Sequence, residues 1–519
     1  MSMAKRVKMT VTAAVLTASM GCVDLDVTNV NEPDRGRALA SAADVEALIS
    51  GTFRTWWELQ QGQAPGPAMA SLADDVSQSQ ANYGFQDQGQ EPPTPIINET
   101  AYQWGYWVYD PWTFTNRALA SLRDGLQSID DLGLEMGVGN QDGPRVQTFA
   151  RFMQGLLLGN IALQYDQGFI LDETVEDPEA LELVPYQDVM AAAREKLATA
   201  REMATDNSFT IPGGWMGPSS YTSDDLVRLT HSYEARFMAQ VARTPADREQ
   251  VLWAEVLAHI NSGVLDDFGI ELAGNDDVWS VNGGMKDQQG DGSNVDLALI
   301  GPADQSGAYA AWEAASPGSK LAFLVDTDDR RITDGTPEGP GAYTTWRNSL
   351  GAPAERGLYF QSNYARKWYL GISETGFGFA PELTVEEMGF LAAEAHIRMG
   401  NPALALPLIN GDRVAVGQLD AATVDGAPGA RCVPRATGLL ARASDTPEGE
   451  CGDLMQTLIY ESRIELAFLT AGNSWYNSRG WGTLRPGRAY HCPIPSVDLE
   501  LLGMPIYTFG GVGGEGSAS

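Results

Sequence analysis

Apolar residues repeat at helical spacing along much of this 519-residue chain, and this pattern constrains the fold more than any other feature. At residues 41–60, Ser41 can cap a helix. One face of that helix would carry Val45, Leu48, Ile49, Phe53 and Trp56. Similar faces predict further helices at 111–129, 145–168, 185–204, 222–243, 246–264 and 451–469, and a helical hairpin at 384–410 that breaks near Gly400 to Pro402. The chain is therefore predicted to be mainly α.

Two long segments of different composition interrupt these helices. Residues 62–110 and 265–383 are rich in Gly, Pro, Asp and Asn, yet they carry many aromatic residues. Loops of this length inside a compact domain are usually functional. We therefore expect helical repeats over about 41–264 and 384–470 to support loop-rich insertions that form a ligand-binding face. The glycine-rich end, residues 510–516, is expected to be a flexible terminus.

The charge of the chain excludes some classes of partner. Its 68 acidic and 34 basic residues give a net charge of -34, so nucleic acid phosphates would be repelled over most of the surface. The four histidines are scattered and there is no CxxC pair, so no metal site or cofactor is predicted. Residues 287–296 have acidic residues at calcium-like spacing but lack the EF-hand register. Neither GxSxG nor HExxH, two common hydrolase motifs, occurs.

The first 21 residues have the layout of a secretory signal peptide. Three basic residues precede a short apolar run that is far below the roughly 20 residues of a membrane-spanning helix. Gly21 and Cys22 resemble a bacterial lipobox, in which Cys22 is acylated and anchors the remaining chain, residues 22–519, to a membrane. Ser19 departs from the leucine usual in that motif. The alternative is an ordinary signal peptide cut near Gly21, which leaves Cys22 free.

The other cysteines suggest one disulfide. Cys432 and Cys451 enclose a short loop rich in Gly, Pro and Thr, and they are candidates for pairing in an oxidising compartment if Cys22 is lipidated. Cys492 would then remain unpaired.

The segment 459–501 resembles the closing signature of the SusD/RagB family. It contains a helix ending in "ELAF", an Arg-Trp-Gly segment and a final "PIP" before an acidic residue, although "LTAGNS" and Asn477 depart from the usual pattern. Other segments agree in order, so the resemblance covers residues 22 to about 501. The matching positions are Glu461, Arg463, Glu465, Leu466, Ala467, Phe468, Arg479, Trp481, Gly482, Pro493, Ile494, Pro495 and Glu500.

The resemblance implies a single domain of four tetratricopeptide-like helix pairs with an irregular ligand-binding face. Family members are outer-membrane lipoproteins that face the cell exterior and lie as a lid on a SusC-like, TonB-dependent transporter. They capture an oligosaccharide or another nutrient and deliver it to that transporter without catalysis. The acidic "VDLD" after Cys22 looks like the surface-export signal of such lipoproteins.

A sugar binder needs aromatic rings for the apolar sugar face and polar groups for the hydroxyl rim. The two loop-rich segments contain both kinds of residue. The candidates for ligand binding are Asp74, Asp75, Asn82, Tyr83, Phe85, Tyr102, Trp104, Trp107, Trp112, Trp279, Asn282, Tyr343, Trp346 and Tyr359. Glu461 and Glu465, one helical turn apart, are expected to form structural ion pairs.

Two other functions are consistent with parts of the sequence. An extracellular glycoside hydrolase would use two of the many acids, placed about 5 to 10 Å apart across a cleft. A tetratricopeptide scaffold would bind a peptide in its concave helical groove rather than on the loops.

Overall fold

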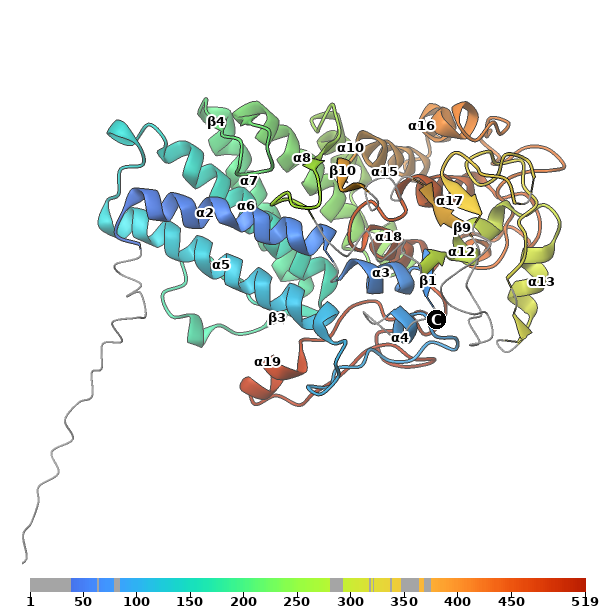
Figure 1. Ribbon diagram of the computed structural model, residues 1–519, viewed down its shortest axis with the longest axis horizontal. Helices are drawn as coiled ribbons and strands as arrows, with labels where there is room; N and C mark the ends of the chain where they lie inside the picture. The colour runs from blue at the N-terminus through green and yellow to red at the C-terminus, as the bar shows by residue number, and fades with distance from the viewer. Residues whose placement is uncertain are drawn as a thin grey trace, which may run out of the picture. The chain divides into compact units, whose positions relative to one another are not determined.

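Helices packed in successive pairs form most of the structure (Figure 1). In this computed structural model each pair also packs on the next, through α5 and α6, α7 and α8, and α10 and α15. The mainly α prediction is therefore confirmed. Over the described residues the pairs are α2 (Ala42–Gln61) with α5 (Tyr106–Leu132), α6 (Gly143–Gln164) with α7 (Tyr186–Asp206), α8 (Ser223–Gln240) with α10 (Trp253–Asn261), and α15 (Val385–Arg398) with α16 (Pro402–Ala415).

Residues 39–519 make up one compact unit. The structure describes residues 39–62, 65–78, 85–280, 293–316, 319–320, 322–336, 338–346, 364–367 and 375–519. The predicted signal peptide and Cys22 lie outside these ranges. Within them, no helix has the length and apolar character needed to cross a membrane.

Local sequence explains where several helices begin. The Ser41 side chain accepts a hydrogen bond from the Asp44 main-chain N–H at 3.2 Å, so it caps α2 as predicted. Thr222 and Asp225 form a capping box at the start of α8. These side chains bond main-chain N–H groups that lack a partner within the first turn. Gly400, with φ of 77°, lies in the break between α15 and α16.

Two helix boundaries differ from the prediction. The segment 246–264 contains α9 (Pro245–Glu249) and α10 instead of one helix, because a capping box of Thr244 and Asp247 starts a helix that ends after little more than a turn. Helix α5 begins at Tyr106 rather than 111, so Pro111 lies inside it. Proline is tolerated best in the first turn of a helix, whereas Pro111 lies beyond the first turn of α5.

Two glycines of α6 permit close packing within the second helix pair and between the second and third pairs. A Cβ on Gly155 would lie 2.7 Å from the Leu197 side chain of α7. A Cβ on Gly159 would lie 2.2 Å from the Phe237 ring of α8. Both distances are far below van der Waals contact, so only glycine permits this close packing.

The loop-rich segments contain short strands and helices. The segment 62–110 contains α3 (Gly66–Leu72) and α4 (Phe85–Gln88). The antiparallel pairs are β1 (Val76–Gln78) with β7 (Ser293–Val295), β6 (Phe268–Ala273) with β10 (Phe377–Leu383), β8 (Thr344–Trp346) with β9 (Tyr364–Arg366), β2 (Gln167–Gly168) with β3 (Val184–Pro185), and β4 (Thr210–Ile211) with β5 (Tyr221–Thr222). The segment 265–383 also contains α12 (Leu297–Ile300) and α13 (Ala308–Ala314), which add to a second hydrophobic core.

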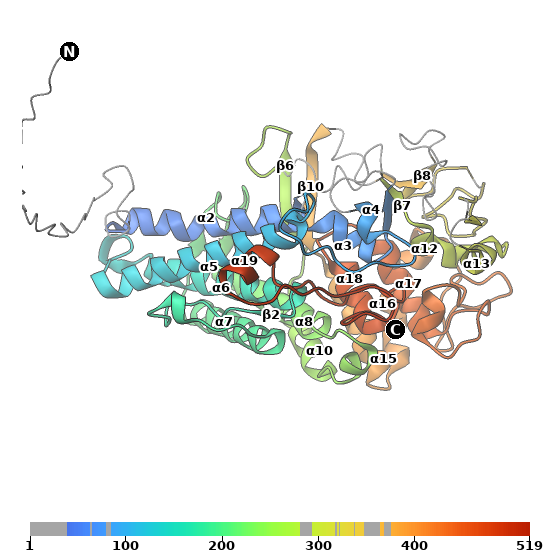
Figure 2. The same ribbon diagram turned by 90° about the horizontal axis from the view of Figure 1, so that it is seen from below.

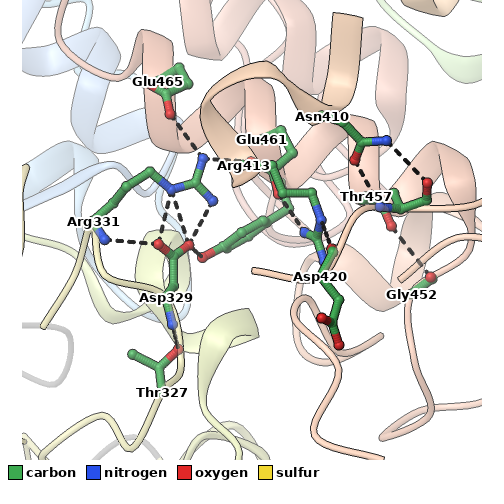
Figure 3. A network of polar contacts seen from close by, with 12 residues as sticks. Thr327, Asp329, Arg331, Asn410, Arg413, Asp420, Gly452, Thr457, Glu461 and Glu465 are labelled. Carbon is green, nitrogen blue, oxygen red and sulfur yellow. Dashed lines mark hydrogen bonds and ion pairs between the residues drawn. The ribbon is translucent and has the colours of Figure 1, made fainter. Parts of the chain in front are cut away.

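Buried charges join the fourth helix pair to α17 (Leu454–Leu466) (Figure 3). Glu461 accepts hydrogen bonds from Arg331 at 2.5 Å and from Arg413 at 2.6 Å. Glu465 accepts from Arg331 at 2.9 Å, and Asp329 binds the same guanidinium. The prediction that Glu461 and Glu465 form structural ion pairs is confirmed.

The C-terminal end is held in place, so the expectation of a flexible terminus is wrong. The chain continues from α18 (Asn473–Trp481) and α19 (Ser496–Leu501) back along earlier segments. Main-chain N–H groups of Gly487 and Gly511 donate to Ala518 and Gly487 at 2.8 Å, and Ile96 donates to Phe509 at 2.9 Å. Cys432 and Cys451 are joined in a disulfide, and Cys492 is a buried free thiol.

Candidate functional site

Short strands gather on one side of the helical scaffold. Strands β7 and β9 pack together, and each pairs with a second strand, β1 and β8 respectively. In Figure 2, β7 and β8 lie on the same side of the unit as the antiparallel pair of β6 and β10. We call these six strands the strand face. It carries Trp346, Phe377 and Phe379 of the second insertion, and Tyr343 directly precedes β8.

Tyr343 and Trp346 are held firmly on the strand face. The half-buried Trp346 meets the Tyr364 ring edge-on, with centroids 5.1 Å apart. The Arg366 guanidinium lies 5.4 Å from the Tyr343 ring centroid and donates to main-chain carbonyls at the end of α17 at 2.6 and 2.8 Å. Burial and the Glu465 carboxylate raise the pKa of Tyr343, so its hydroxyl stays protonated. An anchored ring that keeps some exposed area suits stacking on a sugar.

The strand face also presents two aromatic residues that the sequence analysis missed. Phe377 is 60% exposed and Phe379 is 36% exposed. They stand two residues apart on β10, so both side chains point to the same side of the strand. The alternation in "GFGF", residues 376–379, was the available signal, since aromatic residues at every second position are typical of a strand.

A polar hollow of about 510 Å³ lies beside α4, which packs on β1. Its lining includes Asp87, Gln90, Glu99 and Tyr507 together with isoleucines. The Tyr507 hydroxyl donates to Asp166, whose pKa is raised to about 6 by burial. Carboxylates, an amide and a hydroxyl are the groups that bind sugar hydroxyls, so this hollow is a second place for a small polar ligand.

Tyr102 borders this region, and Trp104 lies close to it in sequence. Tyr102 donates a hydrogen bond to Asp87. Burial, followed by that hydrogen bond, raises the pKa of Tyr102. The half-buried Trp104 meets the Tyr106 ring edge-on at 6.3 Å. These rings come from the loop before α5 and are separate in sequence from those of the strand face.

Two predicted acidic ligand residues are structural. Asp75 is 1% exposed and accepts a hydrogen bond from Arg463 at 2.8 Å. Burial raises the pKa of Asp75, although the Arg463 charge opposes this. Asp74 is 2% exposed and accepts from Arg488 at 3.1 Å. The expectation that these carboxylates face a ligand is wrong, because both are enclosed beside arginines.

The same correction applies to three tryptophans. Trp107 and Trp112 point into the main hydrophobic core, where they are fully buried. Trp279 is also buried, and its carbonyl accepts a hydrogen bond from Trp57 at 3.1 Å. A Gly- and Pro-rich neighbourhood suggested exposure, but these rings fill the core instead.

Five of the predicted residues lie wholly or partly outside the described part of the chain. Asn82, Tyr83, Asn282 and Tyr359 lie outside the described residues. Phe85 begins α4, and its side chain also lies outside them.

Three carboxylates meet elsewhere in the scaffold. Single oxygens of Glu386, Asp412 and Glu465 all lie within 4.8 Å of one another. Burial raises the pKa of Glu386 to about 8, and the Glu465 and Asp412 charges add to this effect. A shared proton therefore accounts for their proximity at neutral pH. These residues do not line the polar hollow.

No protein-family model and no curated protein sequence matches this chain. Similarity appears instead among solved structures. A SusD homolog from Parabacteroides distasonis ATCC 8503 aligns with a TM-score of 0.55 at 11% identity, over 84% of each chain. A SusD superfamily protein from Bacteroides thetaiotaomicron VPI-5482 aligns with a TM-score of 0.52 at 13% identity, over 89% of this chain and 97% of that one.

A SusD superfamily protein from Bacteroides vulgatus ATCC 8482 aligns equally well, with a TM-score of 0.52 at 13% identity. That alignment covers 86% of this chain and 89% of the other. Each of these alignments spans most of both chains. The chain therefore has the fold of SusD superfamily proteins.

Proposed function

We propose that this protein captures a glycan on the strand face and passes it to a SusC-like, TonB-dependent transporter in the outer membrane. The observation that carries the proposal is the presentation of anchored or exposed aromatic rings, Trp346, Phe377 and Phe379, on a SusD-type scaffold. The lipobox-like Cys22 supports an anchored position on the outer surface of the cell. In this account the protein binds its ligand and does not cleave it.

Ring stacking explains the choice of a sugar as ligand. The C–H groups on one face of a pyranose pack on an aromatic ring, and the polar rim is left for hydrogen bonds. Trp346 and Tyr343 supply fixed rings, while Phe377 and Phe379 extend the apolar surface. The net charge of -34 disfavours anionic polysaccharides, so we expect a neutral glycan.

A glycan-binding screen of the full chain, followed by calorimetry with the best neutral oligosaccharide, tests this proposal. Trp346→Ala and Phe377→Ala should each weaken binding by about tenfold, which corresponds to about 1.4 kcal/mol. Phe114→Ala is the matched control, because Phe114 is 40% exposed but belongs to α5. Equal affinity in all three variants would show that the strand face does not bind the glycan.

The same samples test the absence of catalysis. No new reducing ends should form when the protein is incubated with the bound oligosaccharide. Steady release of reducing ends by wild-type protein would favour the hydrolase alternative instead.

A further inference from the structure

Two histidines that are distant in sequence meet between the helices of the third pair. His231 lies on α8 and His259 on α10, and these helices pack side by side (Figure 1). Their Nδ1 atoms are 2.9 Å apart, and their ring centroids are 5.0 Å apart. Both side chains are half-buried, so solvent can reach them. This pair lies on two helices of the scaffold, outside the six strands of the strand face, and has no part in the proposed glycan site.

Both imidazoles are neutral at physiological pH. Burial lowers the pKa of His231 to about 4, and the charges of Arg201 and His259 lower it further. Burial likewise lowers the pKa of His259. A neutral imidazole has a free nitrogen lone pair, which is the form that binds transition metals.

A carboxylate stands behind one of the rings. Glu234 Oε1 lies 3.5 Å from His259 Nε2, on the side of the ring away from His231. Metal-binding histidines usually donate their second N–H to a carboxylate, which fixes the ring and its tautomer. Arg194 and Arg201 pair with Glu234, and Glu255 lies 3.9 Å from Arg194, so the two arginine charges are balanced by two glutamates.

The nitrogen separation indicates a class of metal. With metal–nitrogen bonds of about 2.0 to 2.1 Å, two nitrogens 2.9 Å apart subtend about 90° at the metal. This angle matches adjacent positions of a square-planar or tetragonal site, which Cu²⁺ prefers. A tetrahedral zinc site would require nitrogens about 3.3 Å apart.

We propose that His231 and His259 form a Cu²⁺-binding site, with both Nδ1 atoms as adjacent ligands and water in the remaining positions. Without the metal, one of the two rings donates an Nδ1 proton to the other. On metal binding that ring changes to the tautomer with hydrogen on Nε2, so that both rings carry hydrogen there. His259 can then donate that hydrogen to Glu234. The ion would join α8 to α10.

Copper titration of the full chain tests this inference. Wild-type protein should bind one Cu²⁺ ion whose affinity falls by about tenfold or more in His231→Gln and in His259→Gln. His396→Gln, in a half-buried histidine on α15, is the matched control and should bind as wild type does. Cu²⁺ should also raise the melting temperature of the wild type and the control only, since a ligand of the folded state stabilises it.

Electron paramagnetic resonance of the copper-loaded wild type decides the question even if a variant fails to fold. Hyperfine coupling to two imidazole nitrogens is the expected result. The absence of hyperfine coupling to imidazole nitrogen would overturn the inference, as would equal Cu²⁺ affinity in folded samples of all three variants.

Discussion

Replacing Glu461 by glutamine should destabilise the fold strongly, because this carboxylate joins two arginines inside the scaffold (Figure 3). Glu461 is 1% exposed and lies 2.5 Å from Arg331 and 2.6 Å from Arg413. Arg331 keeps Asp329 and Glu465 as partners in the variant. Arg413 keeps a main-chain acceptor, the Asp420 carbonyl at 2.8 Å, but loses its carboxylate.

Breaking one partner of a buried ion pair costs about 3 to 5 kcal/mol, since the remaining charge stays enclosed. Arg331 keeps two of its three carboxylate partners, so we expect a loss of about 3 kcal/mol, at the lower end of this range, for Glu461→Gln. The control is Glu58→Gln, which removes an exposed ion pair with Arg54 on α2, where both side chains are about half exposed. Exposed helix pairs of this kind contribute about 0.3 to 0.5 kcal/mol.

Urea unfolding followed by tryptophan fluorescence measures both variants. The midpoint for Glu461→Gln should fall well below that of wild type, while Glu58→Gln should unfold close to wild type. Similar midpoints for the two variants would refute the reasoning that burial gives the Glu461 network its stability.

Two further substitutions give predictions of opposite sign. Gly159→Ala should lower the free energy of unfolding, measured in urea, by about 1 to 3 kcal/mol, because the new methyl group would lie 2.2 Å from the Phe237 ring. Unchanged stability would mean that α6 and α8 are not in close contact. The pKa of Glu386 is raised to about 8, so the folded state keeps a proton that the unfolded state releases, and stability should fall as pH rises from about 5 to about 8. Glu386→Gln should remove this dependence of stability on pH, and it should be more stable than wild type at pH 8 by about 2 kcal/mol. A variant that keeps the wild-type pH dependence would contradict the raised pKa of Glu386.

Helix positions could be predicted because their signals are local. The spacing of Val45, Ile49 and Phe53 and the cap at Ser41 lie within a few turns of one another, and α2 forms where they indicate. The break inside 246–264 was missed because the cap at Thr244 starts α9, a short helix that ends before α10 begins. Local signals of this kind compete, and the apolar period alone does not show which one prevails.

Burial and pairing between distant segments could not be predicted in the same way. Asp74 looked like a loop residue, yet its arginine partner lies 414 positions later in the chain. His231 and His259 looked scattered, although helix packing brings their rings together. Such contacts depend on how distant segments meet, which single-sequence periodicity does not contain. Only the "GFGF" alternation at 376–379 offered a local signal that the sequence analysis overlooked.

The central claim is that this protein works on the cell surface with a barrel transporter. Its most direct test is a mild-detergent pull-down of the protein from native outer membrane, with its partners and its own N-terminal mass read by mass spectrometry. The account predicts a co-purifying TonB-dependent transporter and an acylated Cys22 at the N-terminus. A protein recovered alone, with an unmodified N-terminus, would contradict it.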